Sequence, residues 1–192
     1  MNRSRIFRIA EVAMWALVQR HTGRVGYKRG VKSEGLLAEP PFIDCSGWSR
    51  VLLQSAMEAE NAASSQAIFQ AEAISAIQFW SDRIILNIEH RTGILLQGPE
   101  ITAQNLPRCA AIGIKQGSPE WAKNFPRSRG ITHIVQVVRR PTDSAAFVSE
   151  SLGRDEPKGI RLTPLDAWLE SCEPSIQASD VWAVDPFAMA VR

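Results

Sequence analysis

The sequence is poor in the residues that build metal sites and disulfide frameworks. It has only three histidines and three cysteines in 192 residues, and no two cysteines form a C-x-x-C pair. Structural zinc sites use four such ligands at short spacing. We therefore expect no metal and no cofactor. Three cysteines are also an odd number, so a dense disulfide framework is excluded and at least one thiol is free or paired between chains.

Long apolar runs and a strong excess of one charge are also missing. No stretch approaches the roughly 20 apolar residues that a membrane-spanning helix needs. The 22 basic and 20 acidic residues give a formal net charge of +2. A charge this small does not indicate binding to nucleic acid or to an anionic membrane surface. We expect neither a nucleic-acid partner nor membrane insertion.

The N-terminus lacks the pattern of a complete signal peptide. Basic residues precede the apolar stretch 9–18, but Glu11 interrupts that stretch and no small-residue cleavage site follows. Apolar residues recur at helical spacing and predict an amphipathic helix over residues 4–20. We recognise no signal peptide and expect a protein made in the cytoplasm. Activity in the periplasm or cell wall would then require specialised secretion.

The rest of the chain divides into a helical half and a strand-rich half. The length fits one domain over residues 1–192, and 45% apolar with 22% charged residues is typical of a globular protein. Helical patterns follow Asp44 and cover about 66–90, where Gly93 is a stop signal. Short apolar segments rich in β-branched residues then follow at 109–115, 132–139, 145–151 and 159–163. A short helix at 164–170 and an irregular tail close the chain. Helices followed by strands predict an α+β fold, with N-terminal helices packed on a meander of three or four antiparallel strands.

Cys45 has the sequence setting of a reactive thiol. It follows Asp44, a good N-cap residue, and so opens a predicted helix. The positive end of the helix macrodipole and the free first-turn N–H groups both favour the thiolate, which is the nucleophilic form. Small neighbours, Ser46 and Gly47, leave the sulfur approachable. Cys109 and Cys172 lack this setting and are predicted to be structural.

A nucleophilic cysteine needs a base and a group that orients the base. His133 begins the most apolar predicted strand and is the candidate base. Glu150, on the next strand, is the candidate third residue, because a hairpin would place the two strands side by side. Ser149 and Ser151 lie on the opposite face of that strand, and a shift of one residue in register would select one of them instead.

These residues, in this order, resemble a known family of cell-wall hydrolases. D-C-S-G-W at 44–48 looks like the signature that begins the catalytic helix of the NlpC-like peptidoglycan peptidases, a papain-fold superfamily. G-Y-K-R-G at 26–30 resembles the family's upstream tyrosine segment. T-H-I-V-Q-V-V at 132–138 looks like its histidine strand. Weaker similarity covers the strands at 105–114 and 147–165.

The resemblance implies a papain-like NlpC-type domain with a helical insertion at about 60–100. Cys45 would attack an amide of the peptidoglycan stem peptide, with His133 as the base and Glu150 as the third residue. It also implies that Tyr27 lies near the oxyanion site and that Asp44 and Ser46 face the substrate. Without an export signal, such an enzyme would be an antibacterial effector, for example a type VI secretion toxin with a cognate immunity protein, or a phage lysin.

Two other functions remain open from the sequence. The same three residues would serve a papain-fold acyl hydrolase, deamidase or transglutaminase-like toxin that acts on a protein, because these reactions share the acyl-thioester step. Alternatively, the chain is a catalytically inactive wall-binding module. The amide bond cleaved and the role of residues 60–100 are not predicted by the sequence.

Overall fold

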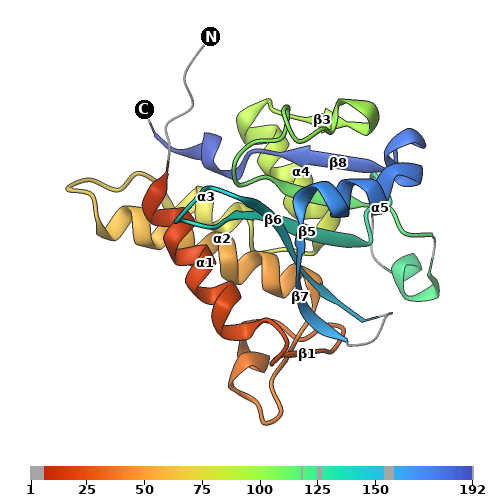
Figure 1. Ribbon diagram of the computed structural model, residues 1–192, viewed down its shortest axis with the longest axis horizontal. Coiled ribbons are helices and arrows are strands. Elements are labelled where there is room, and N and C mark those ends of the chain that lie inside the picture. Colours follow the sequence, from red (N-terminus) through yellow and green to blue (C-terminus); the bar gives the residue numbers. More distant parts are fainter. Residues whose placement is uncertain (1–6, 118, 125–126, 154–157, 192) are drawn as a thin grey trace.

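A six-stranded antiparallel sheet forms the centre of the protein (Figure 1). The computed structural model describes residues 7–117, 119–124, 127–153 and 158–191. The strands of this sheet are Leu96–Gln97 (β3), Ala111–Ile114 (β4), His133–Arg139 (β5), Ala146–Leu152 (β6), Gly159–Pro164 (β7) and Val181–Val184 (β8). They lie in the order β3-β8-β4-β5-β6-β7. Two shorter strands, Gly26–Tyr27 (β1) and Phe42–Ile43 (β2), pair in parallel as a separate ribbon.

Helices cover both faces of the large sheet. Five α-helices lie within the described residues: Arg8–His21 (α1), Cys45–Ala62 (α2), Ala71–Ala76 (α3), Ser81–Thr92 (α4) and Leu165–Gln177 (α5). The helices α1, α2 and α4 pack against one face, and α5 packs against the other. Short 3-10 turns are Ser33–Leu37 (η1), Gly98–Glu100 (η2), Glu120–Asn124 (η3) and Pro186–Met189 (η4). None of the described helices is both long and apolar enough to cross a membrane.

The apolar side chains of β5 belong to two hydrophobic cores, one on each face of the sheet, because successive residues of a strand point to opposite faces. Ile134 and Val138 belong to the core under α1, α2 and α4, and Val135 and Val137 belong to the core under α5. Burial on both faces explains why this strand reads as a continuous apolar run.

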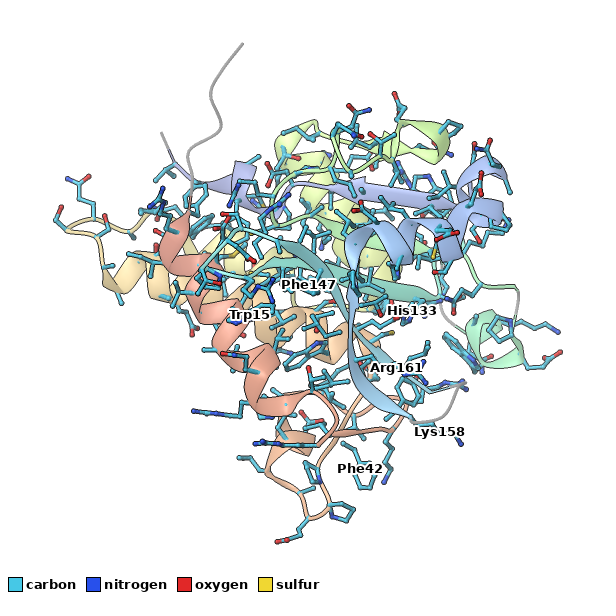
Figure 2. All side chains as sticks on the ribbon, viewed as in Figure 1. Trp15, Phe42, His133, Phe147, Lys158 and Arg161 are labelled. Carbon is cyan, nitrogen blue, oxygen red and sulfur yellow. The ribbon has the colours of Figure 1, made fainter. Side chains whose placement is uncertain are left out.

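Aromatic packing fixes α1 on the edge of this core. The rings of Trp15 on α1 and Phe147 on β6 lie 5.4 Å apart between centroids (Figure 2). The first helix therefore packs beside α2. The sequence predicts a helix over residues 4–20; α1 runs from Arg8 to His21, and residues 4–6 lie outside the described residues.

The α+β class and the packing of N-terminal helices on antiparallel strands are confirmed. The prediction of one helix over 66–90 is wrong, because this segment forms two helices, α3 and α4. Trp80 has extended backbone at the start of α4, and the Asn87 side chain donates a hydrogen bond to the Ala76 carbonyl at the end of α3. The predicted stop is confirmed, because Gly93 ends α4 in the left-handed region at φ 67°.

The C-terminal region is more regular than predicted. The short helix predicted at 164–170 continues to Gln177. Residues 181–184, predicted as an irregular tail, form β8, which is fully buried and pairs with both β3 and β4. A four-residue strand buried on both faces shows no alternation of polar and apolar residues, so the periodicity could not reveal it. The sheet therefore has six strands instead of three or four.

Candidate active site

The N-terminus of α2 holds Cys45 in a fixed position. Asp44 caps the helix, because its Oδ1 accepts a hydrogen bond from the Gly47 N–H at 2.7 Å. Trp48 and Leu52 are fully buried and hold the first turns of α2 against the sheet. The sulfur thus lies at the positive end of an 18-residue helix, and only 8% of Cys45 is exposed.

His133, the first residue of β5, lines the same cleft as Cys45 and acts on the pKa of its thiol. Burial by itself raises the pKa of Cys45, but the hydrogen bond and the charge of His133, helped by the Ile134 N–H, outweigh it and lower that pKa. Cys109 provides the contrast, because burial and the charges of Glu11 and Asp185 raise its pKa to about 12, against weaker effects of Arg139 and Arg108. Of the two buried thiols, Cys45 and Cys109, only Cys45 has a lowered pKa and therefore ionises more readily than a free thiol.

Glu150 lies on the other side of the imidazole. The His133 Nε2 is 2.7 Å from the Glu150 Oε2, so Nδ1 is the ring nitrogen left for the thiol. Burial alone would lower the pKa of His133, but its hydrogen bonds to Cys45 and Glu150 and their charges raise it to about 9. The structure therefore favours a thiolate–imidazolium pair supported by a carboxylate.

The register of β5 and β6 determines which of three polar residues meets the histidine. Ser149 pairs with Gln136, so Glu150 falls on the opposite face of β6, which is the face of His133. The Ser149 hydroxyl instead accepts a hydrogen bond from the Trp48 Nε1–H, and Ser151 donates to the Ile43 carbonyl. The structure thus brings Glu150, and neither serine, to the imidazole.

A cleft of about 240 Å³ opens onto the sulfur and the imidazole. Tyr27 lines it and packs against Gly153, where a Cβ would lie 2.3 Å from the Tyr27 ring. Burial and the charge of Cys45 raise the pKa of Tyr27, against a hydrogen bond from Arg29. The phenol is therefore protonated and available as a donor beside the thiol. Its role at the oxyanion stays a prediction.

Part of the cleft lining comes from the segment between β4 and β5. Trp121, on η3, lines the cleft, and the Arg29 guanidinium carbon lies 4.4 Å from the centroid of its ring. Arg127 lies over the same ring at 5.1 Å. Arg29 therefore supplies a cation to the cleft lining, Arg127 lies next to that lining over Trp121, and none of the described lining residues is acidic.

Asp44 and Ser46, predicted to face the substrate, lie outside the described cleft lining. Asp44 accepts hydrogen bonds from Lys32 Nζ at 2.5 Å and from the Gly30 N–H at 3.0 Å. The Ser46 hydroxyl donates to Asp44 Oδ1 and accepts from Lys32 Nζ. Both residues are buried. They hold the glycine-rich loop against α2, and their contact with a substrate stays a prediction.

Sequence reasoning missed Ser81. Its Oγ lies 3.8 Å from the Cys45 sulfur, and it begins α4. Reading 66–90 as one helix placed Ser81 in a helix interior, where a serine has no special meaning. The S-D pair after Trp80 is a helix-start signal that could have located it.

Among the described residues, no group of three or more metal-binding side chains comes together. Comparison with protein-family models, curated proteins and solved structures found no match for this chain. The function must therefore be argued from the site itself.

Proposed function

We propose that the protein is a cysteine hydrolase that cleaves an amide bond in peptidoglycan stem peptides, on a papain-like, NlpC-type domain. The observation that carries the proposal is the Cys45–His133–Glu150 arrangement: a buried thiol of lowered pKa, an imidazole whose pKa is raised to about 9, and a carboxylate 2.7 Å from that imidazole. This arrangement matches the chemical needs of nucleophilic catalysis.

The reaction follows from the protonation states. The Cys45 thiolate attacks the amide carbonyl carbon, and His133 transfers its proton to the leaving amine nitrogen as the C–N bond breaks. The resulting thioester is hydrolysed by water, from which His133, now neutral, removes a proton. Glu150 holds the ring and stabilises its charged form. The Tyr27 hydroxyl would donate to the oxyanion.

The stem peptide as substrate is supported by two features. The first is the resemblance of residues 44–48, 26–30 and 132–138 to the NlpC-like peptidases. The second is the charge at the cleft, because Arg29 lines it, Arg127 lies over the lining residue Trp121, and no described lining residue is acidic. A substrate that carries free carboxylates, as stem peptides do, fits such a surface.

The test compares purified sacculi treated with wild type, Cys45→Ala and Cys172→Ala. Cys172 lies on α5, which packs on the opposite face of the sheet, so its variant is a matched control. We expect new muropeptides from wild type and Cys172→Ala and none from Cys45→Ala. Equal patterns from all three proteins, or no products from any, would refute the proposed function.

A further inference from the structure

The first residue of α4, Ser81, lies beside the sulfur of Cys45, the first residue of α2. Ser81 is only 3% exposed, and its Oγ lies 3.8 Å from the Cys45 Sγ, within hydrogen-bonding range for sulfur. This hydroxyl has no other hydrogen-bond partner among the described residues. Whether the hydroxyl donates or accepts in this contact depends on the charge of the thiol.

The direction of this hydrogen bond follows from the state of the thiol. Either atom can donate when Cys45 is neutral. A thiolate carries no hydrogen, so only the Ser81 hydroxyl can donate when Cys45 is ionised. A hydrogen bond to a charged acceptor is stronger than one between neutral groups. The contact therefore favours the thiolate over the thiol.

Packing makes the position of Ser81 specific. Gly113 on β4 lets α4 come close to the sheet, because a Cβ at this glycine would lie 2.9 Å from Ile85 and 2.8 Å from Ile131. The next residue, Asp82, accepts hydrogen bonds from the backbone N–H groups of three residues in the segment that leads into β5. The first turn of α4 is thus tied to the same segment that delivers His133.

We propose that Ser81 is a further residue of the active site, whose hydroxyl donates a hydrogen bond to the Cys45 thiolate and holds the sulfur in its reactive form and position. This assigns a role to part of the segment 60–100: α4 supplies a second donor to the nucleophile. The proposal rests on the proposed function only in taking Cys45 to ionise.

Other charges act on the sulfur and stay in place when Ser81 is changed. His133 on β5 lowers the pKa of Cys45, and Asp44 next to it in the chain opposes this effect. The charge of Cys45 also acts on the pKa values of Tyr27 and Arg127, so both groups interact with the thiolate. Replacing Ser81 by alanine changes none of these groups, so a shift in the thiolate titration reports the lost hydroxyl.

The experiment measures the ultraviolet absorbance of the thiolate against pH, with the Cys45→Ala protein subtracted so that only Cys45 contributes. This readout needs neither substrate nor access through the cleft. In Ser81→Ala we expect the midpoint to move to higher pH, and the thiolate population on its acid side to fall by about tenfold, as loss of a charge-assisted hydrogen bond implies. Ser81→Thr keeps the hydroxyl and should retain the wild-type midpoint.

Ser49→Ala is the matched control. Ser49 is another buried serine, one turn further along the helix of the nucleophile, and its hydroxyl has no hydrogen-bond partner within the described part of the chain. This variant should keep the wild-type midpoint. An unchanged midpoint in Ser81→Ala, or an equal shift in Ser49→Ala, would overturn the role of Ser81 while the proposed hydrolysis could still stand. A wild-type Cys45 with an ordinary thiol titration would overturn both.

Discussion

The imidazole of His133 is held by a carboxylate, with Nε2 2.7 Å from the Glu150 Oε2. Glu150 follows His133 by 17 residues on the adjoining strand, whereas Cys45 belongs to a helix much earlier in the chain. The charges of Cys45 and Glu150 both favour the charged form of the imidazole. This relationship predicts how the enzyme depends on Glu150.

Glu150→Gln should lower kcat by about a hundredfold, within the range that positioned proton transfer contributes. The amide keeps the size of the side chain but removes the negative charge that stabilises the imidazolium. The measurement is muropeptide release under saturating substrate. Glu170→Gln, which neutralises an exposed carboxylate on α5, is the control and should retain wild-type kcat. Ser149→Ala and Ser151→Ala should lower stability more than kcat. A larger loss of kcat in either serine variant than in Glu150→Gln would show that Glu150 is not the third residue.

The pH dependence should separate alkylation from hydrolysis. His133 has a pKa raised to about 9, so the imidazolium persists below that pH and is lost as the pH rises through it. Hydrolysis needs the imidazolium to protonate the leaving amine, whereas alkylation by iodoacetamide needs only the thiolate. We expect hydrolysis to decline near pH 9 while alkylation of Cys45 does not.

In Glu150→Gln the alkaline decline of hydrolysis should move to lower pH, because the charge of Glu150 raises the pKa of His133. The check is a full rate profile for both proteins with both reactions. Parallel declines of alkylation and hydrolysis would contradict the assignment of His133 as the proton donor.

The nucleophile was predictable from local sequence because its chemistry is local. The cap at Asp44, the start of the helix at Cys45 and the start of the strand at His133 are each written within a few residues. The choice of Glu150 also needed the hairpin register, which alternation along two adjoining strands makes nearly unambiguous once the strands are paired.

The rest of the site depends on contacts that no local pattern reveals. Ser81 reaches the sulfur only because α3 and α4 are separate helices and Gly113 admits α4 to the sheet. Trp121 meets Arg29 across a distance of many residues, through the tertiary fold. Periodicity shows which face of an element is buried, and does not show which element it is buried against.

The cations at the cleft predict a preference for carboxylated substrates. In Arg29→Gln, we expect KM for a stem peptide with free carboxylates to rise by about tenfold with little change in kcat, as loss of a charge-assisted contact implies. KM for the same peptide with amidated carboxylates should stay near the wild-type value. Lys28→Gln is the control, since Lys28 is an exposed neighbouring cation outside the described cleft lining. Equal effects on both peptides would show that Arg29 acts on the fold of the loop instead.

Asp82 couples the stability of the fold to the placement of the base. It is 1% exposed, and its two oxygens accept hydrogen bonds from the backbone N–H groups of Ser128, Arg129 and Ile131, at 3.0, 3.2 and 3.0 Å. In Asp82→Asn one oxygen becomes an NH₂ group, which cannot accept, so at least one of these N–H groups loses its partner. Such a loss costs about 1–3 kcal/mol of unfolding free energy.

Because these N–H groups belong to the segment that leads into β5, Asp82→Asn should also disturb His133. We expect a lower melting temperature together with a reduced kcat. The midpoint of the Cys45 thiolate titration should move to higher pH, because the imidazole that stabilises the thiolate shifts. Asp143→Asn is the control: Asp143 also accepts a backbone N–H, from Ala145, but in an exposed turn away from the cleft. It should leave both the melting temperature and kcat close to wild type. A destabilised Asp82→Asn protein that retains full kcat and an unchanged thiolate titration at a temperature where it is folded would show that the segment positions His133 without help from α4.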